Sequence, residues 1–146
     1  ALGWAAWKTY LGRAETDGHR CQSLGVLGSA LQSNKRAAEA LPVLEANLAL
    51  LRRYWSDDEQ VILAAQHNIA NCLEDVGRCD EALVLLREVY ARRVATLGVS
   101  HERTILCGSN LVASMLSLKL WDEAKSFGRD HILPVARQSL GADHDE

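Results

Sequence analysis

The sequence predicts an all-α protein, an α-solenoid of stacked antiparallel helix pairs with about seven helices. Short segments recur about 42 residues apart along the chain. Within each copy the apolar residues follow the three-and-four spacing of one helix face. Units of this kind bury a continuous core only by stacking on their neighbours, so the two observations together predict a helical repeat array.

Three kinds of landmark carry the repeat. They are an Asn-led apolar segment at 68 and 110, an acidic residue followed by Ala at 39, 81 and 123, and a Leu-Gly step followed by His at 97 and 140. The last landmark returns after 43 residues instead of 42, so one residue is inserted in the final unit. A loop absorbs such an insertion without changing the helices.

Each unit contains two predicted helices. The expected ranges are 18–33 and 36–54 in the first unit, 60–76 and 80–96 in the second, and 103–118 and 121–139 in the third. Gly77 ends the first helix of the middle unit, and Asp80 and Glu81 suit the N-terminus of the helix that follows. We expect Pro42 to be tolerated with a small bend and Pro134 to kink or shorten the last helix.

The beginning of the chain resembles half a unit. Trp4, Trp7 and Leu11 lie on one helical stripe, which predicts the closing helix of a preceding repeat over residues 2–11. We therefore expect one array made of a half repeat at 2–14, complete repeats at 15–56, 57–98 and 99–141, and the start of a further repeat at 142–146.

These landmarks resemble the tetratricopeptide repeat, in the longer variant of about 42 residues found in kinesin light chains and related scaffold proteins. The matching residues are the Asn68-Ile69-Ala70 step with Gly77, the Glu-Ala openings and the Leu-Gly endings. Lys35 and Lys119 depart from the pattern, because each stands where the family has glycine. HEAT and armadillo repeats have a similar period, but the Glu-Ala opening and the Leu-Gly ending favour the tetratricopeptide repeat.

The resemblance implies a right-handed superhelix whose concave groove is lined by the first helix of each unit and binds protein partners. Carried onto this sequence, it gives twelve candidate partner-binding residues: Ser29, Gln32, Ser33, His67, Asn68, Asn71, Glu74, Asp75, Ser109, Asn110, Ala113 and Leu116. Amide side chains can donate to and accept from a peptide backbone. Because these positions include two acidic residues and neither Lys nor Arg, we expect a neutral or basic ligand segment.

Composition argues against other classes of function. The net charge of -3 disfavours a nucleic-acid surface, and the apolar runs are too short to span a membrane. The cysteines at 21, 72, 79 and 107 lack paired metal-ligand spacing and suit small buried hydrophobes in a reduced, cytoplasmic chain. Ser109 and Cys107 have no His and acidic partners that the sequence places beside them, so we expect no catalytic residue, no metal and no cofactor.

We therefore expect a non-enzymatic scaffold module. The alternatives are a structural or oligomerisation segment and a regulatory region of a larger enzyme or signalling protein. The terminal helices at 2–11 and 121–139 would expose apolar faces that neighbouring repeats normally cover. We expect these exposed faces to favour self-association. The resemblance to the tetratricopeptide repeat implies that Trp121, at the start of a second helix, lies against the preceding helix.

Overall fold

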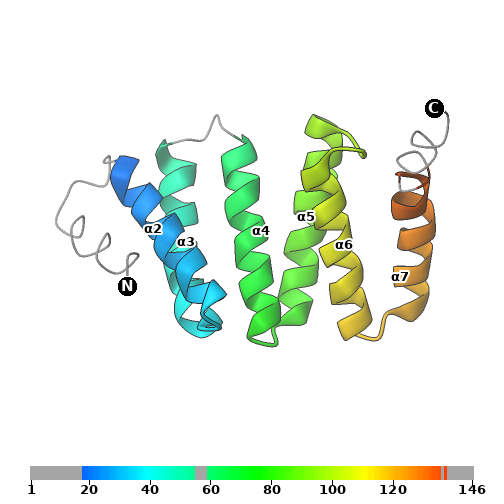
Figure 1. The fold of residues 1–146 in the computed structure, drawn as a ribbon, viewed down its shortest axis with the longest axis horizontal. Helices are drawn as coiled ribbons and strands as arrows, with labels where there is room; N and C mark the ends of the chain where they lie inside the picture. The colour runs from blue at the N-terminus through cyan, green and yellow to red at the C-terminus, as the bar shows by residue number, and fades with distance from the viewer. Residues whose placement is uncertain (1–17, 55–58, 136, 138–146) are drawn as a thin grey trace, which may run out of the picture. The chain divides into compact units, whose positions relative to one another are not determined.

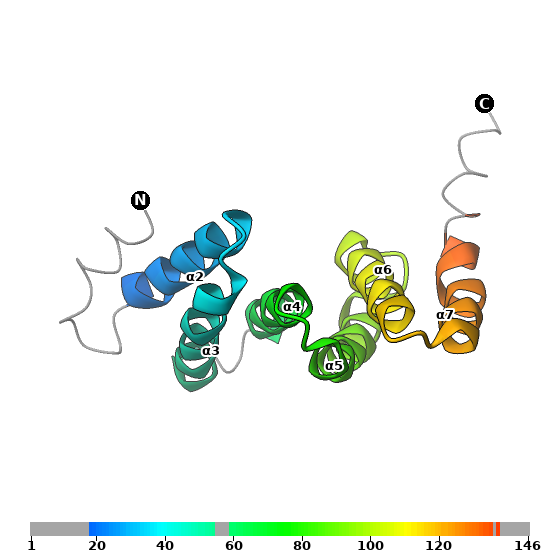
Figure 2. The ribbon, with the colours of Figure 1, turned by 90° about the horizontal axis from the view of Figure 1, so that it is seen from below.

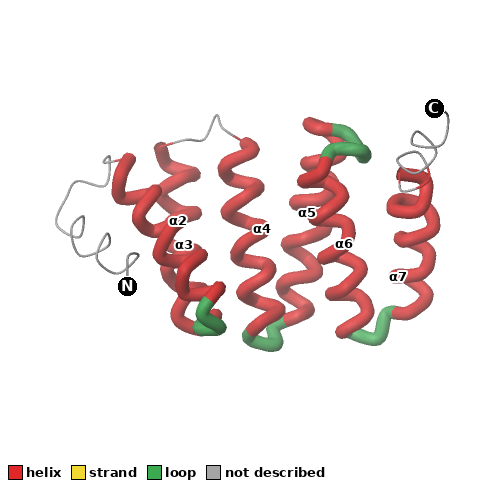
Figure 3. The backbone as a smooth tube through the Cα atoms, in the orientation of Figure 1, coloured by secondary structure: helices red, strands yellow, loops and turns green. Residues whose placement is uncertain are grey.

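The computed structural model describes residues 18–54, 59–135 and 137. Within these ranges the chain is helical with short loops and contains no strand (Figures 1 and 3). The elements are α2 (Gly18–Ser33), α3 (Ala37–Tyr54), α4 (Glu59–Asp75), α5 (Cys79–Leu97), α6 (Glu102–Ser117), α7 (Trp121–Phe127) and the π-helical turn η1 (Gly128–Ile132). The predicted all-α fold is confirmed. The half-repeat helix expected at 2–11 lies outside the described residues.

The chain divides into two compact units, residues 1–78 and 79–146. In the first unit α3 packs against both α2 and α4, as the view in Figure 2 shows. In the second unit α6 packs against α5 on one side and against α7 and η1 on the other. Each unit therefore has a central helix with a neighbour on either side.

The three first helices end in the same turn. Lys35, Gly77 and Lys119 lie 42 residues apart and have φ values of 58°, 81° and 61°. In each turn the amide two residues after the helix cap donates back across the last turn: Arg36 N to Leu31 O at 2.9 Å, Arg78 N to Leu73 O at 2.8 Å and Leu120 N to Met115 O at 2.8 Å. This is the Schellman ending, which satisfies carbonyls that a helix end leaves open. The two lysines adopt the left-handed conformation that glycine favours.

Small residues allow the two helices of each pair to approach. The alanine that opens each second helix is buried, with exposed fractions of 0% for Ala40 and Ala82 and 4% for Ala124. In the first unit Gly28 faces Leu44, and a Cβ added to Gly28 would overlap that leucine side chain. Large apolar residues then fill the rest of the core, among them Leu24, Leu27, Leu44, Leu86, Leu111 and Met115.

The two helix-interior prolines have different surroundings. Pro42 is exposed in the first half of α3, which runs through it without a break, as expected. Pro134 follows η1, where the amide of Leu133 donates to the carbonyl of Gly128 five residues earlier. Because proline lacks an N–H and its ring collides with the carbonyl four residues back, the wider π turn absorbs the mismatch. The last helix thus changes to a π-helical turn over Gly128–Ile132 and continues as an α-helix over 133–135, through Pro134.

Candidate partner-binding surfaces

In the first unit the candidate residues lie on α2 and α4. Gln32 on α2 and Asp75 on α4 approach each other, with the Gln32 Nε2 3.5 Å from the Asp75 Oδ2. This contact places the ends of two successive first helices side by side on one surface. We call this surface the first-helix face; its residues are Ser29, Gln32, Ser33, Asn68, Asn71, Glu74 and Asp75.

The first-helix face is polar and accessible. Ser29, Ser33 and Asp75 are exposed, and Gln32, Asn68, Asn71 and Glu74 are half-buried. Partial burial fixes the position of an amide side chain while leaving polar atoms within reach of a ligand. The face can therefore offer amide donors and acceptors together with the negative charge of Asp75.

His67 differs from its neighbours on the expected stripe, because only 5% of its surface is exposed. The equivalent position in the first repeat is Gly25, where an added Cβ would lie 3.3 Å from the Asn47 Nδ2 of α3. Position 25 thus faces the second helix of its own pair, where little room remains for a side chain. We therefore treat His67 as a buried residue and not as a surface contact. The glycine at position 25 was the sequence signal for this close approach.

In the second unit the candidates Ser109, Asn110, Ala113 and Leu116 all lie on α6. Ala113 and Ser109 are exposed, Asn110 is half-buried, and Leu116 exposes 41% of its surface. The Ser109 hydroxyl donates to the Ile105 carbonyl at 3.1 Å, one turn earlier on the same helix. This part of α6 is thus more apolar than the first-helix face.

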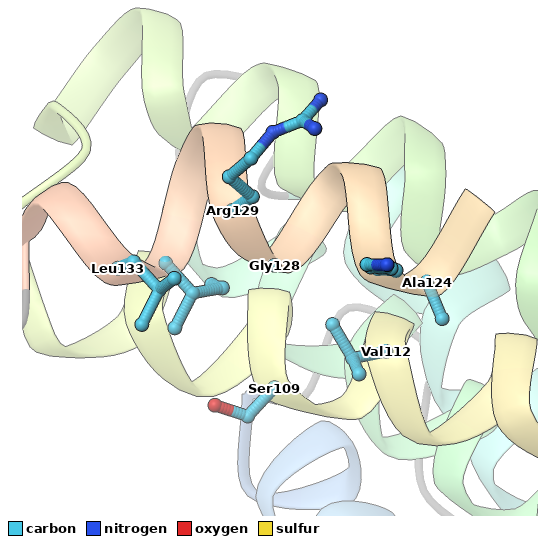
Figure 4. A pocket seen from close by; sticks show the side chains of 8 residues that line it. Ser109, Val112, Ala124, Gly128, Arg129 and Leu133 are labelled. Atoms are coloured by element: carbon cyan, nitrogen blue, oxygen red, sulfur yellow. The ribbon is translucent and has the colours of Figure 1, made fainter. Parts of the chain in front are cut away.

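The second unit contains an apolar pocket of about 600 Å³ that no sequence pattern predicted. It lies between α6 and the α7–η1 segment, and Figure 4 shows Val112 projecting from α6 toward that segment. Its lining includes Ser109, Val112, Ala124, Gly128, Arg129 and Leu133. Ser109 therefore belongs to the edge of this pocket as well as to the candidate stripe.

Trp121 does not pack as expected. At the start of α7 it exposes 60% of its surface, and the corresponding positions of the first two repeats are Ala37 and Cys79. Small residues at those positions leave no space in the repeat for a large aromatic side chain between the helices. Leu120 before it and Leu133 farther along also expose 37% and 48% of their surfaces. The end of the second unit is thus rich in exposed apolar side chains.

The buried polar groups of the second unit are structural. Arg93 exposes 3% of its surface and donates from Nη1 to the carbonyl of Arg103 at 2.8 Å, which ties α5 to the start of α6. Desolvation lowers the pKa of Arg93, although Cys107 nearby acts in the opposite direction. The bond from Nη1 to the Arg103 carbonyl offsets part of the cost of burying this guanidinium.

Burial suppresses the nucleophilic character of two of the cysteines, Cys72 and Cys107. Burial raises the pKa of Cys72 and of Cys107 to about 11, and the Cys107 thiol lies 3.7 Å from the Leu86 carbonyl as a hydrogen-bond donor. The thiolate is the reactive form, so neither side chain is activated at neutral pH. All four cysteines are thiols that form no disulfide. Within the described ranges no three His, Cys, Asp or Glu side chains gather as a metal site would require.

The two units, with their three identical helix endings and buried opening alanines, define the chain as a helical-repeat protein. The sequence model of the tetratricopeptide repeat matches residues 19–93, just over half of the chain. The chain therefore belongs to the tetratricopeptide repeat family. Repeats of this family generally mediate protein–protein interactions, and the fold is typically a non-catalytic scaffold.

Solved structures agree on the fold. Two crystal structures of nearly identical TPR-like repeats from a predicted kinesin light chain of Podosopora anserina superpose with TM-scores of 0.72 and 0.76, each at 22% identity. They match 87% and 94% of this chain, which in turn spans 59% and 65% of theirs. No curated protein matches the chain. Among the described helices, none is long and apolar enough to cross a membrane.

Proposed function

We propose that this chain is a protein-interaction module that holds a peptide or helical segment of a partner protein on its first helices. In the first unit the binding surface is the first-helix face of α2 and α4. In the second unit Asn110, Ala113 and Leu116 of α6 supply further contacts. The family supports binding to proteins in general, and the particular surface is our proposal.

The contact between Gln32 and Asp75 is the observation that carries the proposal. At 3.5 Å it is a long hydrogen bond, but it brings side chains 43 residues apart in sequence onto one surface. A ligand that lies across α2 and α4 would meet both helices there. Such an extended surface, built from successive repeats, is how solenoid proteins bind their partners.

The charges favour a neutral or basic ligand segment. Asp75 is exposed and Glu74 half-buried, whereas neither Lys nor Arg occurs among the residues of the first-helix face. A carboxylate on the ligand would approach like charges and would find no charge-assisted donor among them. The same argument sets nucleic acid and anionic membrane surfaces aside as partners. We place the module in the cytoplasm, where its cysteines would stay in the thiol form.

Alanine substitutions test the surface directly. Fluorescence anisotropy would measure a panel of neutral and basic peptides against the wild type and against Gln32→Ala and Asn68→Ala. We expect each substitution to weaken the best-bound peptide by roughly 5- to 10-fold, the worth of one hydrogen bond. The matched control is Glu45→Ala on the exposed side of α3, which should change binding by less than about twofold.

Two results would contradict the proposal. One is that no peptide of the panel binds, which would favour a structural or oligomerisation segment. The other is that Glu45→Ala weakens binding as much as the two substitutions on the first-helix face. If the chain instead regulates an attached enzyme, the variants would change that activity without changing peptide binding.

A further inference from the structure

The apolar pocket of the second unit has a counterpart elsewhere in the chain. Its residues on α7 and η1 lie 84 residues, two repeat periods, after residues of α3 in the first unit. The pairs are Ala124 with Ala40, Lys125 with Leu41, Gly128 with Leu44, and Ile132 with Leu48. The pocket wall is thus the repeat equivalent of one face of α3.

The first unit shows what covers such a face. Ala40, Leu41, Leu44 and Leu48 are all buried there, with at most 9% of their surfaces exposed. α3 packs against α2, its own partner, and against α4, the first helix of the next repeat. A helix is therefore the element that this kind of surface accepts, and at the α7–η1 wall the corresponding space is the pocket of about 600 Å³.

The pocket differs from its counterpart in shape. Gly128 stands where the first repeat has Leu44, and a Cβ added at Gly128 would meet no atom within 4 Å. In the first repeat the large residue, Leu44, is on the second helix and the glycine facing it, Gly28, is on the first helix. In the third repeat the glycine is on the second helix instead. Val112, at the position of Gly28, fills part of the space but leaves a hollow above Gly128. A helix seated here would have to supply a large apolar side chain of its own.

The pocket also differs in charge. Lys125 stands at the position of Leu41, and Arg129 at the position of Glu45. The pocket wall therefore has two cationic side chains where the first repeat has one acidic side chain. Arg129 also bonds to the Asp130 carboxylate beside it, with its Nε 2.8 Å from Oδ1. A helix with acidic residues at its flank would complement these cations.

We propose that this pocket is the docking site for an amphipathic helix of a partner protein, which inserts a large apolar side chain over Gly128 and sets acidic residues beside Lys125 and Arg129. The proposal is independent of the first-helix face and of its preference for neutral or basic ligands. A second copy of this chain fits less well. The large apolar residues of α2 and α4, such as Leu27 and Leu73, are buried in their own unit. Symmetric pairing of two α7–η1 walls would oppose their cations.

A peptide library on the scaffold of α4 tests the proposal. The 17-residue helix would be displayed with its apolar positions varied among Ala, Leu, Met and Phe, and its flanking positions among Glu, Gln and Lys. Selection on the whole protein should enrich peptides with a large apolar residue and acidic flanks. Gly128→Leu should weaken the best peptide by roughly tenfold or more, because the added side chain occupies the hollow. Val84→Ala, which removes a 70% exposed apolar side chain elsewhere in the second unit, should leave binding within about twofold.

A charge exchange makes the result independent of folding defects. The double variant Lys125→Glu, Arg129→Glu should discriminate against the acidic peptides and prefer matched peptides with Lys at the flanks, a reversal that a misfolded protein would not produce. Failure to enrich such peptides, or equal binding by Gly128→Leu, would overturn the proposal. Sedimentation of the protein alone tests the remaining alternative, in which a second copy of this chain occupies the pocket. A dimer that Gly128→Leu abolishes would identify a second copy as the occupant and would also overturn it.

Discussion

Three residues show how the repeat imposes one conformation on different side chains. Lys35, Gly77 and Lys119 all have positive φ, although only glycine adopts it without a steric cost. The Schellman hydrogen bonds and the packing of the following helix hold the two lysines in place. The cost at these residues is accepted because the direction of the next helix depends on the turn.

Replacing one of these lysines with glycine should therefore stabilise the protein. Lys119→Gly relieves about 1–2 kcal/mol of left-handed strain and loses about 0.5–1 kcal/mol to the flexible unfolded chain, so we expect the free energy of unfolding to rise by up to about 1.5 kcal/mol. Gly77→Ala should lower the free energy of unfolding by about 1 kcal/mol, because alanine is strained in the left-handed conformation. Urea unfolding measures both. A loss of stability in Lys119→Gly would show that the lysine side chain stabilises the turn in another way.

The cysteines give a second prediction at this scale. Cys21, Cys72 and Cys107 are buried and Cys79 is half-buried, so a thiol reagent should label Cys79 rapidly and the other three only on unfolding. The variant Cys79→Ser should lose the rapid phase, and its persistence there would contradict the burial pattern.

Alkaline pH should also reveal the buried thiols. In the folded chain the pKa of Cys72 and of Cys107 is about 11, against about 8.5 for an unfolded thiol. Above pH 8.5 the unfolded chain therefore binds fewer protons, and stability should fall as the pH rises to about 11. Unfolding curves of the wild type and of Cys107→Ala across this range measure the effect. An equal slope in both would exclude Cys107 as a contributor.

At the scale of helices, the opening alanine sets how closely each pair packs. Ala82 has no exposed surface, so the added volume in Ala82→Leu has no space to enter. We expect a loss of about 1–3 kcal/mol in urea unfolding. The matched control is Ala95→Leu on the same helix, where the side chain is exposed and the change should be small. Similar midpoints for the two variants would show that Ala82 is not at a helix joint.

The helices could be predicted because two signals agree, the recurrence of the landmarks and the spacing of apolar residues. Gly77 and Lys119 differ chemically, yet the shared period identifies both as helix endings. The shape of the pocket could not be predicted in the same way. It depends on which of two facing positions carries the larger residue, as the pairs Gly28–Leu44 and Val112–Gly128 show, and a hydrophobic pattern does not distinguish the two arrangements. The burial of His67 depends likewise on how close the neighbouring helix lies.

Across the whole molecule, the two proposed binding surfaces carry charges of opposite sign. The chain has a net charge of -3, and the first-helix face contributes Glu74 and Asp75 to it. The pocket of the second unit instead carries Lys125 and Arg129. A binding module with two such surfaces can select two partner segments by charge, because like charges are disfavoured at each.

We therefore predict that a charge variant of one surface weakens only the peptides that bind to that surface. The double variant Glu74→Gln, Asp75→Asn should weaken basic peptides on the first-helix face by roughly 5- to 10-fold and reduce the salt dependence of their binding, since exposed charges contribute through screened attraction. The pocket variant Lys125→Glu, Arg129→Glu should leave these peptides unaffected. Anisotropy titrations at low and moderate salt would measure both. Preference of the wild type for acidic C-terminal peptides, undiminished in Glu74→Gln, Asp75→Asn, would contradict the charge argument, because a ligand carboxylate would then bind to a face that has no Lys or Arg.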